Sequence, residues 1–238
     1  MKIALIGYGK MGKAIEEIAL QRGHEIVLKI DINNSNEFNQ TNISNADVAI
    51  EFSSPHSAFD NVMRCLQFGT AVVCGSTGWL EKYEEAKKYC IDNNGAFLYS
   101  SNYSIGVNIF FELNKHLASL MAQHNEYDVS MTEIHHTQKK DAPSGTAITL
   151  AEQILENVKR KKLWVNHISD NVDELEIISD RIDPAPGTHQ IKYSSAIDDI
   201  EIIHTAHSRM GFATGAVLAA EFIQNKKGIF SMRDVLGF

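Results

Sequence analysis

The segment from Glu133 to Ala147 holds the densest group of side chains that could do chemistry: two adjacent histidines, two lysines and an aspartate precede a Pro-Ser-Gly-Thr run. Histidine titrates near neutral pH and can supply a proton, and a lysine beside it can orient an anion or donate a proton. His135 with Lys139 is therefore the candidate pair for proton transfer; a histidine that only makes structural hydrogen bonds is the alternative. Neighbouring side chains on an extended backbone point to opposite sides, so His135 and His136 cannot chelate one ion, and we expect no metal site.

The same segment is predicted to enter a helix at Ser144, Gly145 and Thr146. Backbone N–H groups at a helix N-terminus, together with the positive end of the helix dipole and a hydroxyl, can hold a carboxylate or a phosphate. The alternative for Ser144 or Thr146 is an ordinary N-cap. The chemistry predicted for this segment is proton transfer beside a bound anion.

A glycine fingerprint stands at the start of the chain, where Gly7, Gly9 and Gly12 follow a predicted strand and open a helix. The first glycine permits a tight turn, the second lets the backbone approach a pyrophosphate, and the third allows close packing of helix and strand. Nineteen residues after Gly12 stands Asp31, which could accept hydrogen bonds from the adenosine ribose hydroxyls. The pattern predicts a bound dinucleotide, and a fortuitous glycine-rich loop is the alternative.

The residues around Asp31 bear on which dinucleotide is used. An aspartate there would repel a 2′-phosphate, and Ile32 and Asn33 follow it where a phosphate-binding arginine would be useful. We therefore expect NADH or NADPH with a slight preference for NADH. Lys10 or Lys29 could offset the repulsion.

Two further polar segments follow predicted strands at the same sheet edge. Gly75, Ser76 and Thr77 come after the strand at 71–74, and the segment 100–103 follows the strand at 96–99. Ligands of open α/β sheets bind at the carboxyl ends of the strands, so we expect the first segment to contact cofactor and the second to fix its nicotinamide end. An ordinary glycine turn and a plain loop are the alternatives.

The elements that must position these residues fall into two groups. Short apolar strands alternate with amphipathic helices through the first hundred residues, which predicts a Rossmann-type, doubly wound parallel sheet. The strands are expected at 2–6, 26–30, 47–51, 71–74 and 96–99, and the helices at 10–21, 58–68 and 81–93.

The pattern changes after residue 103 to that of an α+β domain with a mainly antiparallel open sheet. A helix at 214–224 is expected to return to the first domain. The predicted domains are therefore 1–103 with 214–238 for dinucleotide binding, and 104–213 for substrate binding and oligomerisation. The expected elements of the second domain are helices at 109–123 and 146–159 and strands at 128–135, 174–178, 187–195 and 199–204.

Composition excludes several classes of protein. The chain has 238 residues, 44% hydrophobic and 22% charged, which is typical of globular domains. A formal net charge of −8 argues against sequence-independent nucleic-acid binding. Apolar runs are far shorter than the roughly eighteen residues of a membrane span, and the N-terminus has no signal-peptide pattern. We expect a cytoplasmic protein that binds neither membrane nor nucleic acid, with its three cysteines reduced.

The sequence resembles the 4-hydroxy-tetrahydrodipicolinate reductase family, also called dihydrodipicolinate reductases, of the diaminopimelate route to lysine. The family's signature is met from Glu133 through Ala147 without a gap. The resemblance extends over nearly the whole chain. Its further motifs are Gly7 to Gly12, Gly75 to Gly78, Ser101 to Asn108, Ser208-Arg209-Met210, Phe212 to Ala216 and Met232 to Leu236.

The resemblance implies roles for single residues. His135 would be the general acid/base and Lys139 the proton donor, and a substrate dicarboxylate would be bound by His136, Ser144, Gly145 and Thr146. A hydride from NADH or NADPH would reduce a cyclic imine in a cytoplasmic homotetramer built through the sheet of the second domain. The implied cofactor contacts are Gly7, Tyr8, Gly9, Lys10, Met11, Gly12, Asp31, Gly75, Ser76, Thr77, Ser100, Ser101, Asn102 and Tyr103.

Some features depart from the family pattern or stay open. The interior of the segment from Arg181 to His189 is unusual, and Arg209 could meet a substrate carboxylate or form a structural ion pair. A dinucleotide-sensing regulator would need no His135 and Lys139 pair. A semialdehyde dehydrogenase would need a reactive thiol, and the three cysteines are expected to be structural: Cys65, Cys74 and Cys90.

Overall fold

The computed structural model describes residues 1–208 and 210–238. Met1–Ile105 and Met210–Phe238 form one compact unit, and the chain between them forms a second. The boundaries predicted after residues 103 and 213 lie two and four residues from these. Arg209, whose role the sequence left open, lies outside the described residues.

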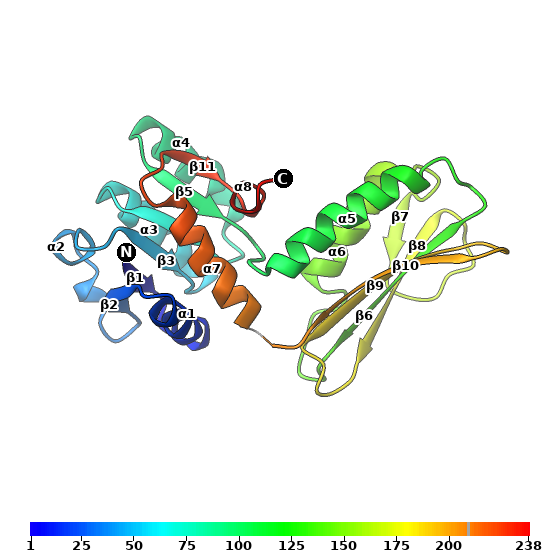
Figure 1. The fold of residues 1–238 in the computed structure, drawn as a ribbon, viewed down its shortest axis with the longest axis horizontal. Helices are drawn as coiled ribbons and strands as arrows, with labels where there is room; N and C mark the ends of the chain where they lie inside the picture. The colour runs from blue at the N-terminus through cyan, green and yellow to red at the C-terminus, as the bar shows by residue number, and fades with distance from the viewer. Residues whose placement is uncertain (209) are drawn as a thin grey trace. The chain divides into compact units, whose positions relative to one another are not determined.

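The first unit is built on a six-stranded sheet in the order β11-β5-β4-β3-β1-β2, and all of its pairings are parallel (Figure 1). Every residue of β3 is buried, as expected for a strand covered on both faces. The predicted doubly wound parallel sheet is confirmed. Its strands are β1 (Lys2–Ile6), β2 (Glu25–Ile30), β3 (Val48–Glu51), β4 (Ala71–Cys74), β5 (Ala96–Tyr99) and β11 (Gly228–Phe230).

Helices cover both faces of this sheet and create two cores. Apolar residues of α3 and α4 pack on one face, and those of α1, α7 and α8 pack on the other. The helices are α1 (Lys10–Gln21), α2 (Gln40–Ile43), α3 (Pro55–Gln67), α4 (Tyr83–Asp92), α7 (Met210–Ile223) and α8 (Met232–Leu236), with short 3-10 turns η1 (Ser35–Glu37) and η2 (Leu80–Lys82).

Helix α7 belongs to the first unit and packs against α1 and strands β3 to β5, with Ala216 and Ala220 in the shared core. Its Gly215 lies against the main chain after β5: a Cβ there would be 1.7 Å from the carbonyl oxygen of Tyr103. Beyond α7, the sequence predicted only a short tail. The chain instead forms β11, which pairs parallel with β5, and then α8.

The second unit has a five-stranded sheet in the order β10-β9-β6-β8-β7. Antiparallel pairings join β10 to β9 and β9 to β6, whereas β6 and β7 both run parallel to β8, so the sheet is mixed within the predicted α+β architecture. The strands are β6 (Asp128–His135), β7 (Leu163–Val165), β8 (Glu174–Arg181), β9 (Gly187–Ser194) and β10 (Asp199–Ala206).

Strand β6 alternates buried and half-buried residues, the pattern of a strand with one covered face. Helices α5 (Ile105–Met121) and α6 (Gly145–Asn157) cover that face, and Figure 1 shows them over the same side of the sheet. Phe110 of α5 and Leu150 of α6 share a core with Met131, Ile177 and Tyr193 of the strands. Among the described residues, no helix is both long and apolar enough to cross a membrane.

The close approach at α7 predicts a contrast between two glycines of one helix. Gly215→Ala should lower the free energy of unfolding by about 1–3 kcal/mol or more, because the Cβ would overlap the Tyr103 carbonyl. Gly211→Ala should be neutral or stabilise by up to about 1 kcal/mol, because among the described residues its Cβ would meet the Ser104 hydroxyl alone, at 3.7 Å. Urea unfolding of both variants measures the difference; equal stability would contradict the predicted contact.

Candidate active site

The three glycines of the fingerprint differ in their surroundings in the way that the motif requires. Gly7 has φ of +97°, and a Cβ there would lie 2.1 Å from the carbonyl oxygen of Phe52. A Cβ at Gly12 would lie 2.5 Å from the carbonyl oxygen of Gly7. At Gly9, by contrast, none of the described residues would come within 4 Å of it. The two outer glycines therefore allow close packing, and Gly9 leaves open space at the N-cap of α1.

The carboxylate of Asp31 is held in a tight turn directly after β2. Its Oδ1 accepts the N–H of Asn33 at 2.7 Å, and its own N–H donates to Asn34 Oδ1 at 2.8 Å. Lys29, one of two lysines that could offset this negative charge, is 2.5 Å from Glu16. The other lysine, Lys10, is exposed. The turn fixes an acidic group at the same sheet edge as Gly9.

Tyr8 and Met11, both implied as cofactor contacts, are half-buried on the fingerprint loop and α1. The hydroxyl of Tyr8 donates a hydrogen bond to Glu16, and Met11 packs against the core below the helix. Their side chains support the loop, so any cofactor contact from them would come mainly from the main chain.

The loop after β4 is held in place by packing and hydrogen bonds. A Cβ at Gly75 would lie 2.2 Å from the ring of Phe52. Ser76 is buried, and its hydroxyl accepts the N–H of Ser53 at 2.8 Å while its carbonyl accepts Nε1 of Trp79. Thr77 is the exposed one of the three predicted contacts.

In the loop after β5, the side chain of Tyr103 points into the core. Ser100 donates to the carbonyl of Asn102 at 2.7 Å, and Ser101 is exposed, so these two lie in an ordered polar turn. Tyr103 is buried, and its hydroxyl donates to the carbonyl of Cys74 at 2.7 Å. We expected its polar group to fix the nicotinamide end of a cofactor; the hydroxyl instead joins β4 to the turn.

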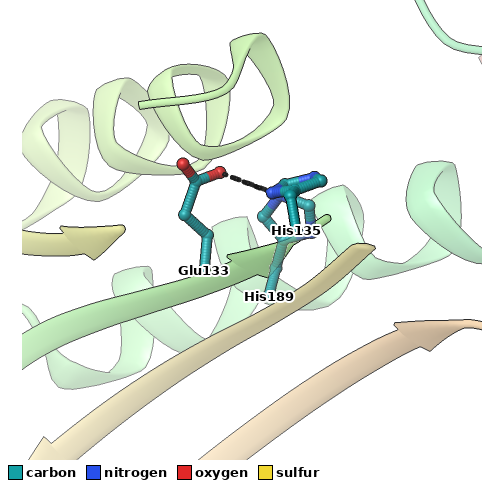
Figure 2. A group of neighbouring side chains, drawn as sticks. All are labelled: Glu133, His135 and His189. Carbon is teal, nitrogen blue, oxygen red and sulfur yellow. Dashed lines mark ion pairs between the residues drawn. The ribbon is translucent and has the colours of Figure 1, made fainter. Parts of the chain in front are cut away.

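In the second unit, His135 lies at the end of β6 in a group of buried ionisable side chains. Figure 2 shows Glu133 and His135 from β6 beside His189 from β9. His135 Nδ1 is 3.4 Å from Glu133 Oε2, and His189 Nε2 is 3.7 Å from the same oxygen. The two imidazole rings meet edge to face with centroids 5.2 Å apart. One carboxylate thus faces two histidines.

Glu133 has no exposed surface, yet its oxygens accept several hydrogen bonds. Oε1 accepts the N–H of Ser144 at 3.0 Å, the hydroxyl of Ser179 at 2.8 Å and Nη2 of Arg181 at 3.2 Å. Burial alone would raise the pKa of Glu133, but the nearby His189 ring and hydrogen bonds from Ser144 and Ser179 outweigh it and hold the pKa well below its usual range. The carboxylate is therefore ionised.

Glu133, His135 and His189 bring their ligand atoms within 4.8 Å of one another, a spacing that a metal ion could use. The donors on Glu133 argue for a different role, because an N–H, a hydroxyl and a guanidinium already bind Oε1 and the Ser144 N–H also reaches Oε2. We interpret the group as a hydrogen-bonded carboxylate that orients imidazoles.

Burial lowers the pKa of His135 to about 4, so the ring is neutral at neutral pH in the free chain. Glu133 raises that pKa, and His189, Lys139 and Arg181 lower it further. A Cβ at Gly187 would lie 3.0 Å from His135 Nε2. The glycine keeps that side of the ring clear.

The start of α6 combines a cap with an open end. Ser144 is buried as the N-cap, where its hydroxyl accepts the N–H of Ala147 at 3.2 Å and lies 3.1 Å from His189 Nε2. The ordinary cap is thus present. Gly145 is exposed, and none of the described residues would lie within 4 Å of a Cβ there; Thr146 is half-buried beside it. Space for an anion remains at this helix N-terminus.

Lys139 lies on the loop between β6 and α6. Its ammonium contacts both carboxylate oxygens of Asp141, at 2.7 and 2.9 Å, and Arg181 Nη2 donates to the carbonyl of Asp141 at 2.6 Å. The loop thus holds a cation near His135, close enough to affect the pKa of that ring.

His136 lines a cavity of ≈ 310 Å³ with the loop before β9. Asp183 from that loop accepts both the N–H and the hydroxyl of Thr137, at 3.1 and 2.6 Å. The segment from Arg181 to His189, to which the sequence assigned no role, therefore holds the loop that carries His136.

Sequence reasoning gave no role to the residues that organise this site. Glu133 was part of the signature, but three of its partners come from strands forty or more residues away: Ser179, Arg181 and His189. The one available signal was the alternation of β6, which places Glu133 and His135 on the same face.

The depressed pKa of His135 predicts how stability depends on pH. Between pH 6.5 and about 4 the unfolded chain protonates this ring while the folded chain keeps it neutral, so the free energy of unfolding should fall as pH decreases through that window. His135→Gln should remove part of the fall. His116→Gln, at an exposed position of α5, serves as control. Urea unfolding between pH 6.5 and about 4 measures the free energy of unfolding of each variant. Identical pH dependence in wild type and His135→Gln would contradict the burial argument.

Both units match models of one protein family. Models of the dihydrodipicolinate reductase N-terminus and C-terminus match residues 1–103 and 106–236. The 4-hydroxy-tetrahydrodipicolinate reductase of Christiangramia forsetii is 51% identical over 236 residues, covering 99% of this chain and 98% of the relative. That of Thermosipho africanus is 34% identical over 238 residues, with coverage of 99% and 98%.

Among solved structures, a dipicolinate-bound dihydrodipicolinate reductase from Paenisporosarcina sp. TG-14 has the same fold, with a TM-score of 0.76, 23% sequence identity and 97% coverage of both chains. Matches to both halves and to full-length relatives lead to one conclusion. The chain belongs to the dihydrodipicolinate reductase family of NAD(P)H-dependent oxidoreductases.

Proposed function

We propose that this chain reduces 4-hydroxy-tetrahydrodipicolinate to tetrahydrodipicolinate in the diaminopimelate route to lysine. The observation that carries the proposal is the buried His135, held against an ionised carboxylate beside the open N-terminus of α6. Loss of the 4-hydroxyl group as water would give a conjugated cyclic imine. Hydride addition to that imine leaves an electron-rich enamine that must be protonated, so the site needs an anion cradle and a proton donor. These residues supply both.

The first unit would hold the cofactor at the carboxyl edge of its sheet. The open space at Gly9 and the first-turn N–H groups of α1 fit a pyrophosphate, and Asp31 fits ribose hydroxyls. When bound, the dihydronicotinamide would supply the hydride. The turns carrying Thr77 and Ser101 present their exposed polar groups at strand ends of the same sheet.

The second unit would hold the substrate by its carboxylates. N–H groups of Gly145 and Thr146 lie in the first turn of α6, where the helix dipole favours an anion, and the missing side chain of Gly145 leaves room for one. His136 would face a second polar group of the substrate. The Paenisporosarcina relative is described as bound to dipicolinate, a ring with two carboxylates, which supports a dicarboxylate substrate.

Proton supply would involve His135 and Lys139. In the free chain His135 is neutral, and a bound dianion would favour its protonated form. Lys139 is held by Asp141, so it is oriented on the loop that leads to α6. We assign His135 the general acid/base role and Lys139 that of a proton donor that also stabilises the anion.

A reactive thiol, which the semialdehyde dehydrogenase alternative requires, is disfavoured by the structure. Cys65, Cys74 and Cys90 are all buried. Burial raises the pKa of each thiol, in Cys90 to about 11, so the thiolate form is scarce at neutral pH.

We further propose a cytoplasmic homotetramer built through the second sheet. Helices α5 and α6 cover one face of that sheet, and β10 forms its edge with Ile200 38% and Ile203 55% exposed. An exposed edge strand with apolar side chains is a favourable surface for pairing with another copy.

A direct test follows oxidation of NADH and NADPH by absorbance with enzymatically generated hydroxy-tetrahydrodipicolinate. His135→Gln and Lys139→Ala should each lower kcat by about 100-fold or more, because each removes a proton-transfer group. Lys140→Ala, an exposed neighbour, is the control. Cofactor affinity from fluorescence titration should stay nearly unchanged. No oxidation by wild type would refute the proposed function, and full turnover in both variants would remove the pair from the mechanism.

Cofactor preference has a separate test at Asp31. Wild type should use NADH with a somewhat higher kcat/KM than NADPH. Asp31→Ser should raise the NADPH to NADH ratio by about tenfold or more, because a like charge beside a 2′-phosphate costs more than ~1.4 kcal/mol. Asp47→Ser removes a carboxylate that precedes β3, at the opposite end of the strands, and should leave the ratio unchanged. A ratio unaffected by Asp31→Ser would place the ribose elsewhere.

A further inference from the structure

The Glu133 carboxylate joins three parts of the second unit at one point. Its Oε1 accepts hydrogen bonds from Ser179 and Arg181 of β8. Both oxygens accept the N–H of Ser144 at the start of α6, at 3.0 and 3.2 Å. The remaining direction of Oε2 faces His135. A side chain with this many fixed donors has little freedom to rotate.

His189 helps to fix the same carboxylate from β9. Its Nε2 lies 3.1 Å from the hydroxyl of Ser144 and 3.7 Å from Glu133 Oε2. In the antiparallel register His189 is the direct cross-strand partner of Glu133. The ring therefore stands between the cap of α6 and the carboxylate, on the face that α6 covers.

The geometry distinguishes the two nitrogens of His135. Nδ1 is buried, and Glu133 Oε2 stands 3.4 Å from it. This contact is longer than an ordinary hydrogen bond, and among the described residues no hydrogen-bond partner reaches Nδ1. Nε2 lies on the side that Gly187 keeps clear. A carboxylate beside Nδ1 favours the proton there and leaves Nε2 for exchange with a ligand.

We propose that Glu133 is a positioning residue, seated by His189 and Ser144, which keeps a proton on Nδ1 of His135 and presents Nε2 to the substrate. Because the same carboxylate binds the Ser144 N–H, the imidazole and the anion-binding helix start are held as one assembly. The proposal deepens the proposed function and rests on the role assigned there to His135.

Charged groups from every neighbouring element bear on the pH dependence. Glu133 from β6 favours the protonated ring of His135, whereas His189 from β9, Arg181 from β8 and Lys139 from the loop oppose it. Neutralising Glu133 therefore leaves only opposing groups. The limb of the rate profile that falls as pH rises through the His135 titration should move to lower pH.

The test compares Glu133→Gln with Glu201→Gln in the full chain. Glu201 is an exposed carboxylate of β10 that pairs with Lys192 at 3.4 Å, so its variant controls for loss of a carboxylate from the same sheet. Ring ¹⁵N shifts of labelled histidine, assigned with His135→Gln, report the tautomer without substrate. We expect an Nδ1–H ring in wild type and Glu201→Gln, and a shift toward Nε2–H in Glu133→Gln.

Kinetics gives the second readout. Glu133→Gln should lower kcat by about 10- to 100-fold, the range seen when an orienting partner is lost, with a much smaller change in KM. Should Glu133→Gln fail to fold, His189→Gln can replace it, because it keeps the Glu133 carboxylate but removes the ring beside it. His189→Gln should shift the His135 tautomer toward Nε2–H, and the pH profile to lower pH, by less than Glu133→Gln.

An Nε2–H ring in wild type, or variants at Glu133 and His189 that keep the wild-type tautomer and pH profile, would overturn the positioning role. A wild-type chain that shows the Nδ1–H ring but does not reduce the substrate would support the positioning of His135 by Glu133 and contradict the proposed function.

Discussion

The second unit depends on one constraint: a carboxylate without exposed surface, that of Glu133, must have its hydrogen bonds satisfied by protein. Its donors come from β8 and from the start of α6, and His189 of β9 lies 3.7 Å from it, so these elements cannot shift independently. The site gains rigidity from a group that does not itself need to touch a ligand. His135 stands beside this fixed charge, and its environment follows from the same contacts.

In the first unit the corresponding constraint is steric. Gly7 packs against the main chain of Phe52, Gly75 packs against the ring of Phe52, and Gly12 packs against Gly7, so the loops at the carboxyl edge meet closely. The hydroxyl of Tyr103 adds a hydrogen bond to the same edge. Close packing below the edge leaves the open space at Gly9 as the approach for a ligand.

Local spacing was enough to predict the parts of the site that are continuous in sequence. The fingerprint and the segment from His135 to Thr146 could be named as candidates because their residue types and spacing lie within a few positions of one another. The role of Glu133 was not, because Arg181 and His189 reach it only through the register of β8 and β9. The burial of the Tyr103 side chain could not be predicted for a similar reason. A tyrosine after a strand can point into a loop or into a core, and the packing of the folded chain decides which. Short elements such as β11, with three residues, carry too little pattern to be predicted.

The return of α7 to the first unit has a consequence for the order in which the protein can form. The core under β1 includes Ala216 and Ala220, which the ribosome adds more than a hundred residues after the first five strands of that sheet. The inserted unit thus has all its strands before α7 emerges to complete the core of the first unit. Until then the early strands have that apolar face only partly covered, by α1, the situation in which chains rely on chaperones.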